Sequence, residues 1–370
     1  MNHIYLDHNA STPVAPDVIN VMRPFLEGNF GNPSSGHWAA LDAKDALEGA
    51  RGQVASFLGC ENDEVIFTSG GTEANNLALK GVWFDRRRRG NHFITSAIEH
   101  DAIRTPLRFL KSLGAKVTIV PVDRYGVVDP EAVRKAVRPE TALISIMHAN
   151  NETGTIQPIE EISRIARDHE ILFHTDAAQS AGKIPTKVSD LGVDFLSLAA
   201  HKMYGPKGVG ALYVRRGIKI ESHSHGAGHE SGQRAGTESA LLTSGLGAAC
   251  ALAQRKSSQP VEALRDKFWE LLQERLGDKV VLNGHPQLRV PNTLNVSFVN
   301  QIGADVLAAL DSVAAATGSA CHAGCVDMSP VLIAMRTPVH VGMGAVRFSL
   351  GRQNTLEEIE SVASRLEEIL

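Results

Sequence analysis

Lys202 lies in a segment whose residue types could carry out covalent chemistry. An apolar, strand-like run from Phe195 to Ala200 precedes it, and a turn rich in glycine and proline, 205–208, follows it. Such a position could hold the amine at a strand end, facing a cleft, where a desolvated lysine can form a Schiff base with a carbonyl cofactor such as pyridoxal phosphate. For this segment taken alone, a surface lysine in a turn is the alternative.

The glycine-rich segment 68–73 could bind the phosphate of such a cofactor. A strand-like stretch, 65–67, enters it, and a helix is expected from Ala74 to Trp83. Small residues let the backbone approach an anion, and the free N–H groups and dipole at a helix start favour phosphate. An ordinary strand-to-helix turn is the alternative. The lysine of a nucleotide P-loop is missing from the segment.

Polar side chains follow two further expected strands, 92–95 and 172–174. His100 comes after the first and could stack on a flat cofactor or transfer protons, although a lone histidine is often a plain polar residue. Asp176 and Gln179 come after the second. A carboxylate there could pair with a protonated ring nitrogen, and an amide could bond a ring oxygen. Asp176 could equally cap a helix.

Alternating strands and helices must position these residues. Strands are expected at 65–67, 92–95, 116–120, 142–147, 172–174 and 195–200, and the helices between them include 74–83, 129–137 and 159–169. Strands separated by helices predict a mainly parallel α/β sheet, whose ligands bind at the carboxyl ends of the strands. The polar cluster 150–152 follows such an end.

Composition limits the possible functions. The chain has 370 residues, 43% of them hydrophobic, and a formal charge of −4, which gives no general reason to expect direct nucleic-acid binding. No apolar run approaches the roughly 20 residues that span a bilayer, and the N-terminus lacks a signal pattern. We therefore expect no membrane contact and a cytoplasmic protein. Four scattered cysteines predict reduced thiols, and Cys60 and Cys250 read as small buried hydrophobes.

In its motifs the chain resembles the NifS-like group of cysteine desulfurases, pyridoxal-phosphate enzymes of the class V aminotransferase superfamily. The resemblance runs from Tyr5 to Arg352, nearly the whole chain. The motifs that carry it are Phe30–Ser34, Phe67–Glu73, Glu99–His100, Met147–Gly154, Asp176–Ser180, His201–Gly208, Arg234–Thr237 and Gly318–Cys321.

The resemblance implies a role for each matching residue. For the cofactor, it implies that Lys202 is the Schiff-base lysine, that Gly71, Thr72 and His201 bind the phosphate, and that His100 stacks on the ring and transfers protons. It also implies that Asp176 contacts the pyridine nitrogen and Gln179 the ring oxygen. Asn151 and Arg347 would bind the substrate carboxylate, and Thr237 would contact the phosphate of a neighbouring subunit. That last contact implies a homodimer. Two positions depart from the family pattern: Ala199 replaces a frequent serine that bonds phosphate, and Ala200 replaces a usual glycine.

Cys321 lies among small residues in the segment 317–330. This suits a thiol that moves between a substrate and an acceptor, and cysteine attacks as thiolate. An incidental loop cysteine is the alternative, whereas the resemblance puts Cys321 at the nucleophile position. Cys325 either relays a persulfide or is inert. Its spacing to His322 could attract a metal, but no second ligand pair supports a zinc site.

The activity that the resemblance implies is conversion of L-cysteine to L-alanine, with a persulfide on Cys321. The sulfur would pass to an acceptor protein, in iron–sulfur cluster assembly, thiolation or DNA phosphorothioation. A selenocysteine lyase of the same group is an alternative, because His322 directly after the cysteine also resembles those enzymes. A sulfur-carrier scaffold with decayed activity is another, opposed by the intact Lys202, Asp176 and Arg347.

The implied architecture is the α/β fold type I of pyridoxal-phosphate-dependent transferases. It predicts a large domain, 15–256, with a mainly parallel seven-stranded sheet. A smaller α/β domain combines 1–14 with 257–370 and carries the cysteine segment; the polar stretch 257–260 favours the boundary. The histidines 223, 225 and 229 have flexible spacing that predicts no metal, and Arg86–Arg89 reads as a solvated helix end.

Overall fold

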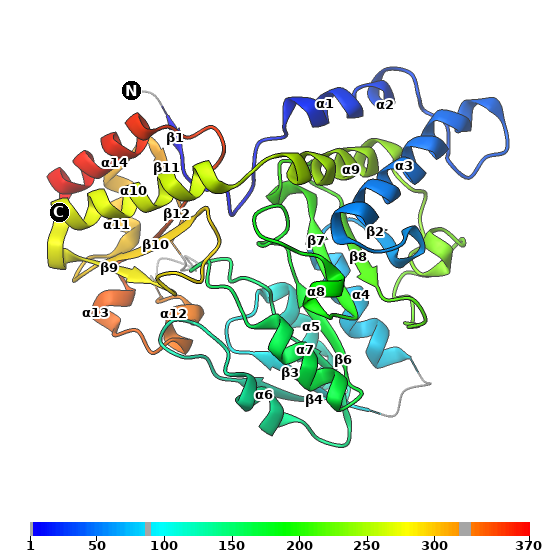
Figure 1. Cartoon of the computed structure of the whole chain (residues 1–370), viewed down its shortest axis with the longest axis horizontal. Helices are drawn as coiled ribbons and strands as arrows, with labels where there is room; N and C mark the ends of the chain where they lie inside the picture. The colour runs from blue at the N-terminus through cyan, green and yellow to red at the C-terminus, as the bar shows by residue number, and fades with distance from the viewer. Residues whose placement is uncertain (1–2, 86–89, 318–326) are drawn as a thin grey trace.

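The structure, a computed structural model, describes residues 3–85, 90–317 and 327–370. Within these residues the largest sheet has seven strands (Figure 1). In spatial order they are β2 (Val65–Thr68), β8 (Gly210–Val214), β7 (Phe195–Ala199), β6 (Leu172–Asp176), β5 (Thr141–Ser145), β3 (His92–Ser96) and β4 (Lys116–Val120). The predicted α/β fold with a mainly parallel seven-stranded sheet is confirmed.

The direction of the strands decides where polar side chains gather. β8 runs antiparallel to both of its neighbours, β2 and β7, and every other pairing in the sheet is parallel. The carboxyl ends of β2, β3, β5, β6 and β7 therefore meet at one edge. The sequence analysis did not predict β8, which pairs directly with the strand before it in the chain.

Helices cover both faces of this sheet because its strands are apolar on both sides. Phe93 and Leu143 pack into a core with α4 (Gly71–Phe84) and α5 (Asp101–Ser112). The next residue on each strand, Ile94 or Ile144, faces the opposite core, as the alternation of side chains along a strand requires. The helices that contribute to that second core are α1 (Pro16–Met22), α3 (Leu41–Leu58), α6 (Pro130–Ala136), α7 (Ile159–Asp168), α8 (Val188–Leu191), α9 (Ala240–Arg255) and α12 (Pro330–Ala334).

A third core joins the N-terminal residues to the C-terminal part of the chain. β1 (Ile4–Tyr5) pairs in parallel with β11 (Val313–Ala314), and Ile4 and Leu6 are buried there. An antiparallel sheet lies beside this pair, in the order β12 (Ala345–Ser349), β10 (Thr293–Phe298) and β9 (Val280–Asn283). The helices of this region are α10 (Gln259–Leu276), α11 (Gly303–Ala309), α12 (Pro330–Ala334), α13 (Val339–Gly342) and α14 (Leu356–Ile369). Figure 1 shows α9 leading into α10 between the two regions.

Local sequence explains where the elements differ from expectation. α1 ends before Arg23, and α2 (Pro24–Glu27) starts with a proline at its first position, where its missing N–H costs no hydrogen bond. α4 begins at Gly71, earlier than predicted, so the glycine-rich segment itself forms the helix start. The arginines 86–89 and the residues Cys321, His322 and Cys325 lie outside the described part of the chain.

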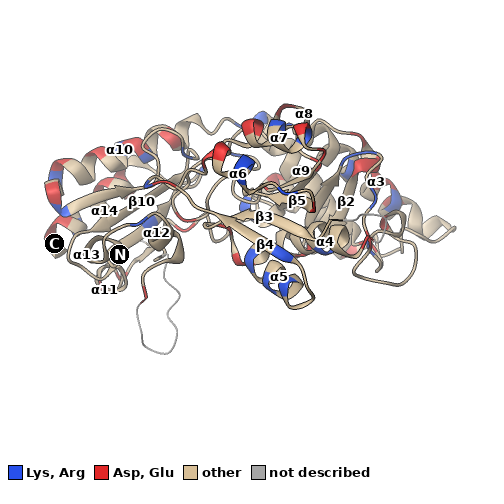
Figure 2. Cartoon of the chain, turned by 90° about the horizontal axis from the view of Figure 1, so that it is seen from below, with Lys and Arg blue, Asp and Glu red and all other residues tan. Residues whose placement is uncertain are grey.

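The surface carries both signs of charge. Figure 2 shows acidic and basic residues side by side on α7 and α10. Along the described ranges, no helix combines the length and apolar character that crossing a membrane requires.

Candidate functional site

One cavity collects the residues predicted from separate parts of the chain. It has a volume of about 360 Å³ and lies at the carboxyl ends of the parallel strands. Nine of the predicted residues line it: Gly71, Thr72, His100, Asn151, Asp176, Gln179, His201, Lys202 and Arg347. The fold therefore converts positions spread over most of the sequence into a single site.

Lys202 stands at the end of β7, in a short 3₁₀ turn that spans Ala200–Lys202. Its Nζ donates hydrogen bonds to the backbone oxygens of Asn9 at 2.5 Å and Ala10 at 2.9 Å. Burial and the positive charge of Arg347 lower the pKa of the amine to about 8, against the smaller effect of two nearby carboxylates. A larger fraction of this lysine is therefore uncharged near neutral pH than of an exposed one.

At the start of α4, the backbone itself lines the cavity and packs closely against β8. Gly70 has a φ of 152°, which favours glycine. A side chain on Gly210 of β8 would come within 2.8 Å of the Gly70 backbone, so the strand passes directly beneath this turn. The side chain of Ala199 lies 3.5 Å from where a Cβ on Gly71 would stand. The departure from the family pattern at Ala199 thus falls beside the helix start.

His201 adds an imidazole to the cavity wall. Burial, with the charges of Lys202 and Lys207, lowers its pKa to about 4, so the ring is neutral at physiological pH. Its Nδ1 is buried and has no hydrogen-bond partner within the described chain. A buried ring nitrogen without a partner is costly unless a ligand satisfies it. The position thus fits a ligand that carries hydrogen-bonding oxygen atoms.

Asp176 is the last residue of β6 and is buried. Its Oδ2 accepts a hydrogen bond from Nδ2 of Asn75 at 2.7 Å, and its Oδ1 accepts one from the backbone N–H of Ala178 at 2.9 Å. The contact to Ala178 closes a turn and caps no helix, because residues 178–183 form turns, and the carboxylate lines the cavity. Asn75 was not predicted as a site residue. The signal in the sequence was a polar residue among the apolar residues of α4 that face the core.

His100 is the N-cap of α5, and this contact determines which ring nitrogen carries the proton when the ring is neutral. Its Nδ1 accepts a hydrogen bond from the backbone N–H of Ala102 at 3.0 Å. A neutral ring in this position must carry its proton on Nε2. Glu99 beside it is buried, which raises the pKa of its carboxyl to about 8.

Arg347 reaches the cavity from β12, in the C-terminal part of the chain. It donates hydrogen bonds to the backbone oxygen of Asn151 at 2.9 Å and to the carboxylate of Asp7 at 2.7 Å. These contacts bring the N-terminal residues, the loop after β5 and β12 together. Asp7 was not predicted to have a role, although it lies at the start of the family resemblance.

Two predicted residues are not among the described residues that line this cavity. Thr237 is exposed and lies outside the residues that line it. Cys321 lies outside the described residues. On either side of its segment, described residues form hydrogen bonds to residues in or beside the site. Ala316 pairs with Arg347 through two backbone hydrogen bonds, and the hydroxyl of Ser329 donates to the carboxylate of Glu152.

The two other cysteines behave as expected of structural residues. Cys250, on α9, is buried in the core, and burial raises the pKa of its thiol. Cys60 is half-buried, and burial with nearby carboxylates raises the pKa of its thiol to about 12. Neither residue forms the thiolate that nucleophilic attack requires. The described residues contain no group of three histidine, cysteine or acidic side chains suited to a metal ion.

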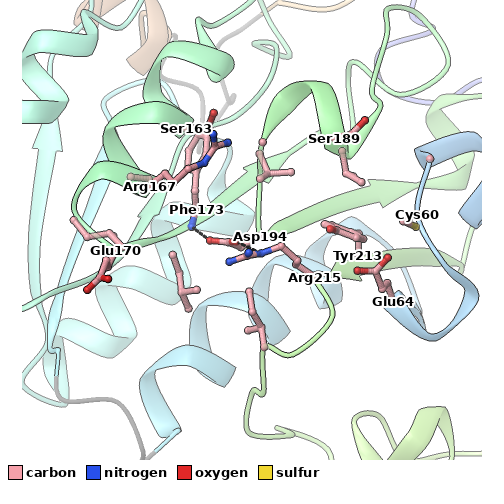
Figure 3. Close-up of a pocket in the computed structure, with 18 residues that line it drawn as sticks. Cys60, Glu64, Ser163, Arg167, Glu170, Phe173, Ser189, Asp194, Tyr213 and Arg215 are labelled. Carbon is pink, nitrogen blue, oxygen red and sulfur yellow. Dashed lines mark hydrogen bonds and ion pairs between the residues drawn. The ribbon is translucent and has the colours of Figure 1, made fainter.

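A larger hollow of about 760 Å³ lies at the opposite edge of the same sheet (Figure 3). Its walls include Asp194, which accepts hydrogen bonds from the backbone of Phe173 at 2.9 Å and forms an ion pair with Arg215 at 2.6 Å. None of the predicted site residues lines it. We therefore assign the chemistry to the smaller cavity, where polar groups without partners and a lysine with a lowered pKa converge.

Comparisons with known proteins show the family of the chain. The family model "Aminotransferase class-V" matches residues 4–362. "Cysteine desulfurase IscS" of Dictyoglomus turgidum is 47% identical, over 99% of this chain and 94% of that protein. A solved structure of a NifS-like protein is 38% identical with a TM-score of 0.92 and covers 99% of both chains. The structure described as "SspA in complex with cysteine" is 37% identical with a TM-score of 0.82, over 94% of this chain and 98% of that one. The chain belongs to the class-V aminotransferase family.

Proposed function

We propose that the protein is a pyridoxal-phosphate-dependent L-cysteine desulfurase. It removes sulfur from L-cysteine, holds it as a persulfide on Cys321 and releases L-alanine. The observation that carries this proposal is the convergence of nine predicted residues on one cavity. The names of the full-length relatives support the same reaction, and the related structure with cysteine supports the substrate.

The side chains of the cavity suit the parts of pyridoxal phosphate. The N–H groups at the start of α4, with Thr72 and the neutral ring of His201, would hold the phosphate. Asp176 would face the pyridine nitrogen, and Gln179 the ring oxygen. Lys202 would form the covalent bond. When bound, the cofactor supplies an electron sink for bond breaking at the substrate's carbon atoms.

Substrate and proton handling fall to the residues around that lysine. Arg347 and Asn151 would bind the substrate carboxylate, because a guanidinium and an amide both donate to carboxylate oxygens. Once displaced, the amine of Lys202 can take and return protons, since its pKa is about 8. His100 would stack on the ring and present its Nε2 proton.

Cys321 is the proposed nucleophile. Its thiolate attacks the substrate sulfur, so that a new S–S bond forms while the C–S bond breaks. The electron pair of the broken bond stays with the carbon, which takes up a proton and leaves as alanine. Support comes from the described flank at Ala316, which is paired with Arg347.

Mass spectrometry after incubation with L-cysteine tests the reaction directly. We expect alanine in solution and one extra sulfur atom on Cys321. Cys321→Ala should abolish the persulfide but leave binding of pyridoxal phosphate intact. A variant that still forms persulfide at the normal rate would refute the assignment. Selenocysteine assayed beside cysteine separates a lyase from a desulfurase, and a purified protein without any bound cofactor would favour a scaffold.

A homodimer is part of the proposal. Leu26, Phe30 and Trp38 expose 72, 83 and 81% of their surface, and their segment extends from the body of the molecule beside α3 (Figure 1). Exposed large apolar side chains gathered in one segment are typical of an interface. A second copy would cover them. Thr237, exposed in one subunit, would then complete the phosphate site of its partner.

The final steps and the organisation of the chain complete the proposal. The sulfur passes to an acceptor protein in the cytoplasm, with iron–sulfur cluster assembly, thiolation and DNA phosphorothioation as the candidate destinations. We divide the chain into a large domain, 15–256, and a small domain, 1–14 with 257–370. Support for this division comes from the separate core that includes Ile4 and Leu6.

A further inference from the structure

The backbone oxygen of Asn9 orients two groups of the cavity at once. It accepts hydrogen bonds from Nζ of Lys202 at 2.5 Å and from Nε2 of Gln179 at 2.9 Å. The side chain of Asn9 is itself held by Nδ2 donation to Thr293 at 2.8 Å and by acceptance from Asn292 at 3.0 Å. Asn9, to which the sequence analysis gave no role, is therefore held in place at the site.

Lys183 lies behind this arrangement. Its Nζ donates to Oδ1 of Asn9 and to Oε1 of Gln179, both at 3.0 Å. Lys183 and Lys202 line the same small hollow of about 30 Å³. Burial, with the charges of Lys202 and Arg347, lowers the pKa of Lys183 well below its ordinary value. The lysine is thus a second amine of the site, placed behind the residues that line the cavity.

These contacts permit only one orientation of the Gln179 amide. A backbone carbonyl oxygen can only accept a hydrogen bond, and a lysine amine can donate one whether it is charged or neutral. The amide oxygen must therefore face Lys183, and the amide nitrogen must face Asn9. The amide nitrogen carries two hydrogens, and the Asn9 oxygen takes one of them. Because Gln179 lines the cavity, the other hydrogen is available to an acceptor there.

We infer that Lys183 is a positioning residue of this site, which fixes Gln179 as a hydrogen-bond donor toward the ring oxygen of pyridoxal phosphate. The inference rests on the proposed function, since it requires that cofactor in the cavity. Without Lys183 the amide of Gln179 loses the partner of its oxygen and can rotate. Only the Asn9 oxygen would then hold the amide nitrogen, so the N–H group presented to the cofactor would be less fixed in direction.

Titration of the apoenzyme with pyridoxal phosphate tests the inference. Lys183→Met removes the donor while keeping much of the side-chain volume, and we expect about tenfold weaker binding, the effect of one lost hydrogen bond. The absorbance of the bound cofactor should also change its pH midpoint, because the ring oxygen loses a fixed donor. Lys187→Met is the matched control: this exposed lysine bonds the Ser56 oxygen on the surface and should change neither quantity.

A double-mutant cycle distinguishes positioning from general stabilisation. Gln179→Leu removes the group through which Lys183 is inferred to act. In that background Lys183→Met should weaken binding by less than about twofold, whereas independent effects would multiply. Independent effects, or an unchanged affinity in Lys183→Met, would overturn the inference.

Two further results bear on the inference: a Lys183→Met protein that does not fold, and a wild-type protein that does not bind pyridoxal phosphate. If Lys183→Met does not fold, Lys183→Gln keeps one N–H donor and should bind the cofactor with intermediate affinity and restore the wild-type pH midpoint in part. A Lys183→Gln enzyme identical to wild type in both quantities would also overturn the inference. A wild-type protein that does not bind pyridoxal phosphate would refute the proposed function itself.

Discussion

The guanidinium of Arg347 donates a hydrogen bond from Nη2 to the carboxylate of Asp7 at 2.7 Å, although 340 residues separate the two in sequence. A second bond, from Nη1, reaches the backbone oxygen of Asn151 at 2.9 Å. Within the described chain its buried Nε has no partner. The cation that we assign to the substrate carboxylate is therefore held in place by the protein's own N-terminal residues.

Asp7→Asn should weaken substrate binding. The change preserves the size of the side chain but removes the charge that holds Arg347, so we expect KM for L-cysteine to rise by about tenfold with a smaller change in kcat. Steady-state kinetics measure this. Asp311→Asn, which alters an exposed ion pair with Arg365, is the control. An unchanged KM in Asp7→Asn would contradict the role of this contact.

The rate at which the apoenzyme binds pyridoxal phosphate should rise with pH through about 8. The Lys202 amine must lose its proton before it attacks a carbonyl, and its pKa is lowered to about 8. Arg347→Met removes a positive charge beside the amine, so the pKa should rise and the midpoint should move to higher pH. Stopped-flow absorbance at several pH values measures both. A midpoint that does not move would mean that burial alone sets this pKa.

Ala199→Ser should tighten cofactor binding. Ala199 is buried and its side chain lies beside the glycines at the start of α4. A hydroxyl there would gain a hydrogen bond to the phosphate, so we expect roughly threefold to tenfold higher affinity. In the apoenzyme the same hydroxyl is buried without that partner, and the thermal midpoint should fall slightly. Ser197→Ala, which removes a hydroxyl bonded to His174 at 3.0 Å instead, should lower stability without raising affinity.

Glu152→Gln should change how stability depends on pH. Burial raises the pKa of Glu152 to about 7, so the folded state binds more protons than the unfolded state between about pH 4.5 and 7. Wild-type stability therefore loses this contribution as pH rises through that window. The variant has no carboxyl here to titrate, so its stability relative to wild type should increase by roughly 2.5 kcal/mol between pH 5 and 8.

Urea unfolding of the apoenzyme at the two pH values measures this difference. Glu161→Gln, on the exposed face of α7, is the matched control and should give the same offset at both. A constant offset for Glu152→Gln as well would show that the carboxyl bonded to Ser329 does not titrate in this range.

Trp38→Asp should separate the proposed dimer into monomers. The indole exposes 81% of its surface, so the change costs a folded monomer little, whereas a charge in an apolar interface would be expensive. Sedimentation should show the mass halve, and cofactor affinity should fall because Thr237 of the neighbouring subunit is lost. Leu356→Asp, at an exposed position of α14 in the other region of the molecule, is the control and should leave the dimer intact.

Much of the fold followed from local patterns. Apolar runs separated by amphipathic helices predicted most strands of the large sheet, because strand and helix periodicities are local properties of the chain. β8, β9 and β12 were not predicted. They are short, and a short apolar run forms a strand only where a sheet can pair with it, so their existence depends on the sheet that they join. Gly71 was predicted as a phosphate-side residue, but only the structure shows that it opens the helix.

The sequence by itself determined the chemistry: a lysine at a strand end, a glycine-rich helix start, an aspartate and a glutamine after one strand, and a cysteine among small residues. These are properties of residue type and spacing. The tertiary structure decided which backbone and side-chain groups support them. The contacts of Asn9, Asn75, Asp7 and Lys183 join residues far apart in sequence. No local pattern indicates such contacts, because they exist only once the strand ends, the N-terminal residues and β12 meet around one cavity.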